Sequence, residues 1–304
     1  LKGGKGARCS REKTQIVQEL KHRHPLGALL KLAGLARSTF YYQQSSRLLP
    51  DKYAALKSLI QSTYDVNKGR YGYRRIAATV RRAGHKVSHT TVQRLMGEMG
   101  LKSRVRLKRF TSYRGDAGKT VANLMKRDFK FKADHVPYRN SEQPNQKWVT
   151  DVTEFKVKGE KLYLSPVLDL YNGEIVAYQT AKRPQFVMVT DMLEKAFKRL
   201  TEGDSPMLHT DQGWQYRMPS YQHLLRENDV EQSMSRKGNC LDNATMESFF
   251  GTLKSEYFYL ERFDSVDQLE AGLDDYIRYY NHDRIKLKLG GMSPVEYRAQ
   301  AEMV

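Results

Sequence analysis

Three carboxylates in the second half of this 304-residue chain occupy positions from which they could meet. Asp151 lies within a run of β-forming residues, KWVTDVTEFKV, so we predict it inside a strand. Asp211 follows a later short strand, PMLHT, and Glu247 lies in the first turns of a long predicted helix, ATMESFFGTLKSEYFY. Ligands of open α/β sheets bind at the carboxyl ends of strands. The three side chains are therefore predicted to point at one site.

Clustered carboxylates are typical of sites for hard divalent cations, because Mg²⁺ prefers oxygen ligands and keeps water and substrate oxygens besides. Without a cation the like charges would repel one another, and each group would resist ionisation. Two ions about 4 Å apart can activate an attacking oxygen and stabilise a leaving one at a phosphodiester. We predict such a two-Mg²⁺ site, open also to Mn²⁺, on Asp151, Asp211 and Glu247. Any one of these residues alone would be an ordinary exposed carboxylate.

Two further side chains could reach the same site. Lys254 follows Glu247 by seven residues, nearly two helical turns, so it projects from the same helix face and could hold a DNA phosphate. An ordinary surface lysine is the alternative. His209 precedes Asp211 by two residues on the same strand face, as a possible auxiliary group at the phosphate or as a hydrogen-bonded core residue.

The elements that must position these groups begin at Lys147. Three predicted strands (KWVTDVTEFKV, KLYLSPVLDLY and EIVAYQTA) are followed by helix, strand, helix, strand and helix. Asn172-Gly173 predicts a hairpin between the second and third strands. Asp169, near the end of the second strand, either supports the site from behind or belongs to the turn. This order predicts an α/β core with a mixed five-stranded sheet and flanking helices.

Charge divides the chain into two unlike halves. The net charge is +18 overall, +24 over residues 1–140 and −6 over residues 141–304. A strongly basic segment ahead of a mildly acidic one indicates a polyanion-binding part, with a solvated basic surface as the alternative. Two cysteines are too few for a disulfide framework or a four-ligand zinc site. No run of about 18 apolar residues and no secretory signal is present, so we expect an intracellular protein without a membrane partner.

The basic half is predicted to hold two helix-turn-helix modules. In the first, a helix at 29–33 meets Gly34 as a turn, and Ser38 caps a second helix; a plain helical hairpin is the alternative. In the second, YGYRRIAATVRRAG precedes a helix capped by Ser88, HTTVQRLMGEMGL. Its polar face suits phosphates and base edges. The predicted DNA contacts are Arg37, Ser38, Thr39, Arg74, Arg75, His89, Thr90, Gln93, Arg94, Arg104, Arg106, Lys108, Arg109, Arg236, Lys237 and Asn243, the last of which could instead cap its helix.

Longer strings resemble a known family. Between Asp211 and Glu247 lie 35 residues, the spacing of DDE transposases and retroviral integrases. The strings WVTDVTEF, HTDQGWQY and SRKGNCLDNATMESFFGTLKSE are similar to the insertion-sequence-three family, specifically the product of its second reading frame. The segments YGYRRIAATVRRAGHKVSHTTVQRLMGEMGL and YNHDRIKLKLGGMSPVEY resemble that family's second helix-turn-helix and closing segment. Two departures are Trp214, in place of a small polar residue, and the absence of the usual His within 285–289. Both put local DNA contacts in doubt rather than catalysis.

The resemblance implies a ribonuclease-H-like catalytic core, with the three carboxylates as metal-binding triad and Lys254 at the basic position of the triad helix. It also implies that the active enzyme is made by fusion to an upstream helix-turn-helix frame. We expect five parts: a first helix-turn-helix-like segment (1–48), a second module (49–103), a basic linker (104–143), the catalytic core (144–262) and a C-terminal helical tail (263–304).

The expected reaction has two stages. Water attacks a phosphodiester at the end of the element and leaves a 3′-hydroxyl, which then attacks another phosphodiester without a covalent protein–DNA intermediate. Element ends and target are double-stranded DNA, and two ends require a homodimer or a larger synaptic assembly in the bacterial cytoplasm, at the nucleoid. The alternatives are a DNA-binding regulator of transposition with an inactive core, and a structure-specific nuclease that cuts but does not join.

Overall fold

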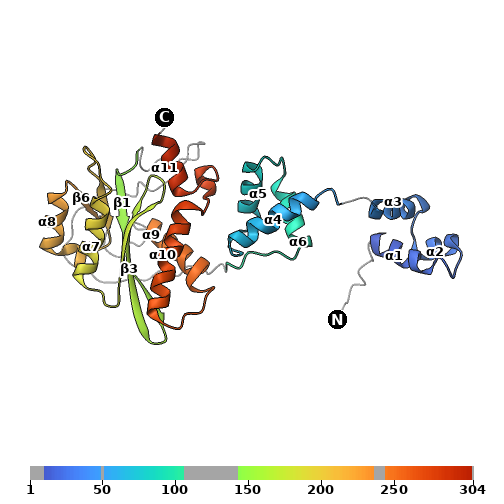
Figure 1. The fold of residues 1–304 in the computed structure, drawn as a ribbon, viewed down its shortest axis with the longest axis horizontal. Coiled ribbons are helices and arrows are strands. Elements are labelled where there is room, and N and C mark those ends of the chain that lie inside the picture. The colour runs from blue at the N-terminus through green and yellow to red at the C-terminus, as the bar shows by residue number, and fades with distance from the viewer. Residues whose placement is uncertain (1–9, 49–50, 106–142, 236–243, 303–304) are drawn as a thin grey trace. The chain divides into compact units, whose positions relative to one another are not determined.

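The computed structural model describes residues 10–48, 51–105, 143–235 and 244–302 (Figure 1). The chain divides into two compact units, residues 1–61 and 62–304. The division falls inside helix α4 (Ala54–Val66), whereas the predicted module boundary lies after residue 48. Within the described ranges, no helix is long and apolar enough to cross a membrane.

The first unit contains a small three-helix cluster. Helices α1 (Ser10–Leu20), α2 (Leu26–Ala33) and α3 (Arg37–Leu48) bury one shared set of apolar side chains: Val17, Leu29, Leu30, Leu35 and Phe40.

The turn between α2 and α3 follows the prediction only in part. Gly34 ends α2 with a φ of +57°, a conformation that glycine adopts without steric cost. Helix α3 begins at Arg37 rather than after Ser38, and the Phe40 amide donates to the carbonyl of Ala36 at 3.0 Å. Ser38 therefore lies inside the helix, and its predicted role as a cap is wrong.

Helices α5 (Tyr73–Arg82) and α6 (His89–Glu98) lie in the second unit. The Ser88 hydroxyl accepts a hydrogen bond from the Thr91 amide at 3.1 Å, so the predicted cap of α6 is confirmed. The two helices bury their predicted apolar faces: Ile76, Ala77, Val80, Val92, Leu95 and Met96.

The mixed sheet is confirmed, but its first strand is broken. Strand β1 (Lys147–Thr150) pairs antiparallel with β3 (Glu160–Asp169) and parallel with β5 (Met207–Thr210), whereas β2 (Thr153–Val157) pairs antiparallel with β3. At the break, the Asp151 carboxylate accepts a hydrogen bond from the Val152 amide at 2.7 Å. The sheet therefore has six segments rather than five, in the order β2-β3-β1-β5-β6, with β4 (Ile175–Ala181) beside β3 and β6 (Glu231–Met234) at the far end.

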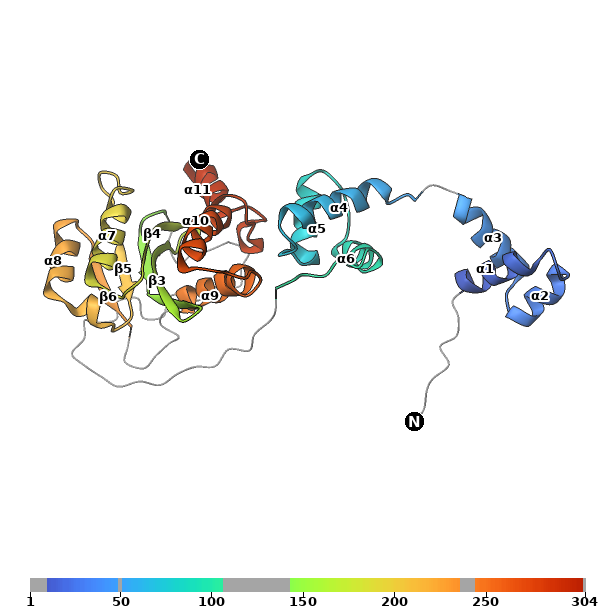
Figure 2. The same cartoon turned by 60° about the horizontal axis from the view of Figure 1, so that its bottom comes forward.

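Helices cover both faces of the sheet (Figures 1 and 2). Successive strand residues point to opposite faces. Trp148 therefore packs with α7 (Phe186–Phe197) and α8 (Pro219–Glu227), and its neighbour Val149 packs with the helices of the other face. Those are α9 (Ala244–Leu253) and α10 (Val266–His282), followed in the chain by α11 (Pro294–Glu302).

The C-terminal helices share a hydrophobic core with the sheet. Leu269, Leu273 and Tyr276 of α10 belong to the same buried cluster as Val149 and Phe155 of the sheet. A boundary at residue 262 therefore does not separate two hydrophobic cores.

Gly272 of α10 provides a test of this packing. A Cβ atom there would lie 1.8 Å from the Tyr257 hydroxyl, and the Tyr257 ring stacks on Tyr276 at a centroid distance of 5.6 Å. We expect Gly272→Ala to lower the free energy of unfolding by about 1–3 kcal/mol, because the ring must move in a filled core. Gly251→Ala on α9 is the control, since no atom lies within 4 Å of its Cβ position, and it should stabilise by up to about 1 kcal/mol. Urea unfolding of both variants measures these changes. If Gly272→Ala stabilised the protein as much as Gly251→Ala, the close packing of Tyr257 against Gly272 would be contradicted.

Candidate catalytic site

Two of the predicted carboxylates lie side by side because of strand register. In the parallel pair of β1 and β5, Trp148 is opposite Leu208 and Val149 is opposite His209. Continuing this register places Asp151 opposite Asp211, each directly after the end of its strand. The carboxyl ends of adjacent parallel strands thus bring the two carboxylates together. Asp151 lies directly after β1, so its predicted place inside a strand is wrong.

The local backbone holds both aspartates. The Val152 amide donates to Asp151 Oδ1 at 2.7 Å, and the Gly213 amide donates to Asp211 Oδ1 at 2.8 Å. A Cβ atom at Gly213 would lie 2.7 Å from the Gln215 side chain and 2.9 Å from the same Asp211 oxygen, so a larger residue would displace these side chains. Each aspartate is therefore oriented through one oxygen.

Glu247 lies on a helix and not on a strand, in the first turn of α9. The helix is anchored on the sheet by four buried side chains: Met246, Phe249, Phe250 and Leu253. Glu247 is half-buried, and its negative charge acts on Asp151. Glu247 therefore lies near enough to Asp151 for its charge to act on that carboxylate.

The electrostatics are those of carboxylates crowded together. Burial, followed by the negative charges of Asp211 and Glu247, raises the pKa of Asp151 to about 7, against the opposing effects of the Val152 hydrogen bond and the Lys254 charge. Burial also raises the pKa values of Asp211 and Glu247 above their ordinary values. A divalent cation would relieve this repulsion, and the donors are all carboxylate oxygens, as Mg²⁺ prefers. Across the described residues, no three His, Cys, Asp or Glu side chains already form a group that could hold a metal ion, so the carboxylates would have to draw closer around one.

Lys254 lies beside the carboxylates. After α9 the chain continues into a π-helical turn, Lys254–Phe258. The Lys254 ammonium donates to the Thr153 hydroxyl at 2.7 Å and sits 5.2 Å from the centre of the Phe155 ring. Its charge lowers the pKa of Asp151, which places it on the site face of the helix, as the seven-residue spacing indicates.

His209 has its contact within the sheet. The ring is fully buried on β5, and Nδ1 lies 2.9 Å from the Ser233 hydroxyl on β6. This contact favours the core alternative, and we do not assign His209 to the catalytic group.

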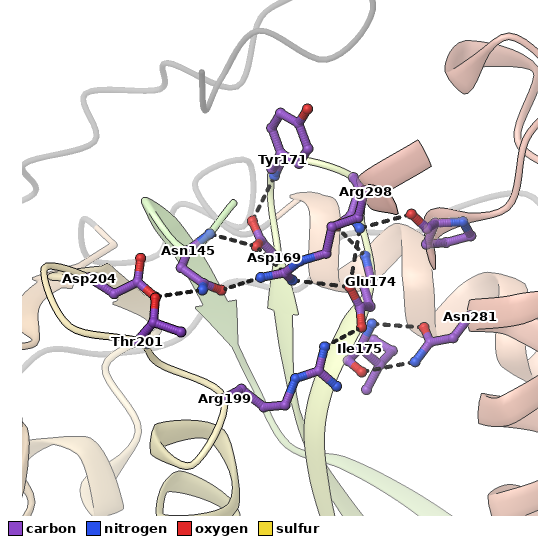
Figure 3. A network of polar contacts seen from close by, with 12 residues as sticks. Asn145, Asp169, Tyr171, Glu174, Ile175, Arg199, Thr201, Asp204, Asn281 and Arg298 are labelled. Atoms are coloured by element: carbon purple, nitrogen blue, oxygen red, sulfur yellow. Dashed lines mark hydrogen bonds and ion pairs between the residues drawn. The ribbon is translucent and has the colours of Figure 1, made fainter. Parts of the chain in front are cut away.

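Asp169 lies at the opposite end of β1, since it is paired with Trp148. Its oxygens accept hydrogen bonds from the amides of Asn145 and Tyr171, both at 2.9 Å, and burial raises its pKa to about 6. Figure 3 shows Asp169 in a network with Arg298 of α11 and the buried Glu174. Asp169 thus holds the hairpin and α11 in place and does not support the triad.

The predicted DNA contacts fall into three groups. Most of those that the structure describes have exposed or half-exposed side chains: Arg37, Ser38, Thr39, Arg74, His89, Thr90, Gln93, Arg94 and Arg104, with Arg94 paired to Glu98. Arg75 instead forms an ion pair with the buried Glu256 at 3.0 Å, so its predicted DNA contact gives way to an internal one. Six lie outside the described residues: Arg106, Lys108, Arg109, Arg236, Lys237 and Asn243.

Comparison with known proteins places this architecture in a family. Residues 141–240 and 247–301 each match an integrase core domain, and residues 51–109 match an HTH-like domain. The putative transposase InsK for insertion sequence element IS150 of Escherichia coli (strain K12) is 51% identical over 289 residues, which cover 95% of this chain and 99% of the relative. Transposase InsF for insertion sequence IS3A of the same organism is 32% identical over 243 residues, which cover 79% and 81%. The chain therefore belongs to the insertion-sequence-three family of DDE transposases.

Proposed function

We propose that Asp151, Asp211 and Glu247 bind divalent cations and catalyse both the cleavage of element ends and the joining of the 3′-hydroxyl to target DNA. The observation that carries this proposal is the meeting of two adjacent strand ends with the first turn of α9, where each added charge acts on Asp151. Two Mg²⁺ ions, or Mn²⁺ in their place, would supply activation of the attacking oxygen and stabilisation of the leaving one.

The protein side chains hold the reacting groups. Asp151 and Asp211 each accept a backbone amide through Oδ1, and their carboxylates would hold the cation. Glu247 would complete the site from the helix, and the Lys254 ammonium, which donates to the Thr153 hydroxyl, would hold a phosphate oxygen. Cleavage by water and joining by a 3′-hydroxyl are both displacements at phosphorus by an oxygen, so one site serves both steps.

DNA contacts outside the site are proposed for the basic, exposed side chains of the helical modules. On α6, His89, Thr90, Gln93 and Arg94 form one exposed polar face. Because most of these contacts neutralise phosphates, affinity for end DNA should fall steeply with rising salt. The other proposed contacts are Arg37, Ser38, Thr39, Arg74, Arg104, Arg106, Lys108, Arg109, Arg236, Lys237 and Asn243.

The partners follow from the reaction. Joining both ends of an element to one target requires two active sites, so we propose a homodimer or a larger synaptic assembly on double-stranded DNA. With bacterial chromosomal DNA as target, the reaction would take place at the nucleoid. A product of the upstream helix-turn-helix frame, fused or separate, would complete the enzyme.

The test is a strand-transfer assay. Labelled element-end DNA with a free 3′-hydroxyl is incubated with plasmid target, the full chain and Mg²⁺, with a chelator as control. Joined product that forms only with the cation supports the proposal. Cutting without joining would point to a nuclease, and binding without either reaction, with Mn²⁺ also failing, would point to a regulator.

Cation binding should also be visible in stability. Because a ligand of the folded state stabilises it by mass action, Mg²⁺ at ten times its Kd would add about 1.4 kcal/mol to the free energy of unfolding. We expect Mg²⁺ to raise the melting temperature of the wild type, and this rise to be absent in Asp211→Asn. Glu154→Gln is the control, since Glu154 is an exposed residue of β2 paired with Lys161, and it should keep the rise. An equal rise in all three proteins would mean that Mg²⁺ acts elsewhere.

A further inference from the structure

Glu256 is a buried carboxylate outside the catalytic group. It lies in the π-helical turn directly after α9 and is 3% exposed. The Arg284 guanidinium donates to both of its oxygens at 2.7 Å, and the Tyr276 hydroxyl donates at 3.2 Å. Burial alone would raise the pKa of Glu256, but the hydrogen bonds and charges of Arg284 and Arg75 hold it below the ordinary value. Glu256 is therefore an ionised group in the interior.

Two more arginines bond to Glu256, one just before α5 and one in its first turn. Arg75 donates to Glu256 Oε1 at 3.0 Å, and Arg70 donates through Nε to the Glu256 carbonyl, also at 3.0 Å. The Arg70 guanidinium lies 4.7 Å from the centre of the Tyr279 ring. We call Glu256, Arg70, Arg75 and Arg284 the Glu256 cluster. It joins the segment that carries α5 and α6 to the helix that carries Glu247.

Other hydrogen bonds also join the segment that carries α5 and α6 to the C-terminal part of the chain. The Tyr71 hydroxyl accepts from the Ile285 amide at 2.8 Å, and the Tyr279 hydroxyl donates to Asn67 Oδ1 at 3.0 Å. Arg82, at the end of α5, donates to the Gly291 carbonyl at 2.7 Å. Each of these bonds joins residues more than 200 positions apart in the chain. The segment from Asn67 to Arg82, which contains α5, is thus held by directional hydrogen bonds at several points.

Charge-assisted hydrogen bonds in the interior favour one arrangement. A buried carboxylate that loses a cationic partner is left with an uncompensated charge, so a displaced α5 segment would be penalised. Bidentate arginine–carboxylate pairs also have narrow geometric requirements. If α5 and α6 slid or tilted against the core, the hydrogen bonds of the Glu256 cluster would therefore break, and no equivalent set would replace them.

We propose that Glu256, Arg70 and Arg75 are positioning residues that set the distance between the DNA bound by α6 and the phosphodiester cleaved beside Glu247. This inference rests on the proposed function of both parts. Only nine positions along one continuous helical segment separate Glu247 from Glu256. The module that reads the element end is thereby tied to the catalytic helix itself, and the place of the cut becomes a fixed distance from the bound sequence.

The test compares neighbouring arginines. Element-end DNA labelled at its 5′ end is cleaved by the full-length wild type, Arg75→Met, Arg75→Lys and Arg74→Met, and the cut positions are mapped at single-nucleotide resolution. Arg74 is the control, because it is exposed on the same helix and its guanidinium contacts Tyr73 rather than Glu256. We expect Arg75→Met to raise the fraction of misplaced cuts about five- to tenfold, at the lower end of couplings between two sites. Arg75→Lys should restore part of the accuracy, since it keeps the charge.

Arg74→Met should weaken end binding and leave the cut positions unchanged. The proposal is overturned if Arg75→Met cuts as accurately as the wild type, or if it only weakens binding as Arg74→Met does; in the second case Arg75 is a DNA contact. A role confined to folding would lower the yield of cleavage without moving the cut.

A distance measurement keeps the test independent of catalysis. Spin labels at Gly97→Cys on α6 and Glu202→Cys on the core, both exposed positions, are placed in a chain with Cys9→Ser and Cys240→Ser. The wild type should give one narrow distance distribution, and Arg75→Met a broader one. If the wild type does not cleave DNA, but its distance distribution is narrower than that of Arg75→Met, the proposed function fails and the positioning role stands. Equal distributions overturn the positioning role.

Discussion

Replacing Glu247 by glutamine is expected to abolish strand transfer while leaving the fold intact. The substitution keeps the size of the side chain but removes its negative charge, and a neutral amide is a poor ligand for Mg²⁺. Loss of one member of a catalytic group that acts as a unit typically costs about three orders of magnitude or more in rate. The measurement is the initial rate of joined product at saturating Mg²⁺, with element-end DNA and plasmid target.

Folding is not expected to suffer, because Glu247 is half-buried and its negative charge raises the pKa of Asp151 in the metal-free protein. The melting temperature without Mg²⁺ should therefore stay the same or rise. Glu154→Gln is again the matched control, with full activity expected, since that side chain is exposed and bonded to Lys161. Joining by Glu247→Gln at a rate within tenfold of the wild type would remove Glu247 from the catalytic group.

The largest loss of stability is expected from Arg284→Met. Arg284 is 5% exposed and supplies both short hydrogen bonds to the Glu256 carboxylate. Removing one partner of a buried ion pair typically costs about 3–5 kcal/mol, because the remaining charge stays in the interior. Urea unfolding at pH 7 measures this loss. A change below about 1 kcal/mol would show that Glu256 is solvated, as surface pairs are.

The companion variant Arg284→Met/Glu256→Gln isolates the cause. Removing the second charge should recover part of the stability, because no uncompensated carboxylate is left. If the double variant is as unstable as the sum of the two single variants, lost packing rather than a buried charge explains the effect.

The stability provided by Glu256 should also depend on pH. Its pKa is lower in the folded protein than the ordinary value of 4.5, so the folded state binds fewer protons than the unfolded state in that range. The contribution is therefore complete above pH 4.5 and is lost as the pH falls through the lower pKa of the folded state. The difference in stability between the wild type and Glu256→Gln should shrink accordingly in acid.

The elements that carry the proposed catalytic group could be predicted from the sequence because they follow from local patterns. The end of a strand at Asp211 and the start of a helix before Glu247 are readable from neighbouring residues, whereas Asp151 was predicted inside a strand and lies directly after β1. The α6 cap at Ser88 and the inward faces of α5 and α6 were predictable for the same reason, since capping and periodicity depend on residues within a few positions. The spacing and strings that resemble the transposase family added the identity of the reaction.

Only the tertiary structure decided which polar side chains meet across the chain. Helical periodicity placed Arg75 off the apolar face of α5, but it could not show a buried carboxylate 181 positions away that draws its guanidinium inward. In the same way, Asp169 near a strand end looked able to support the triad until strand register placed it at the opposite end of β1. The pattern of apolar residues predicts which face of an element is buried. The partner of a buried charge depends on long-range packing, because the free energy of the charged group depends on the polar groups that replace water around it.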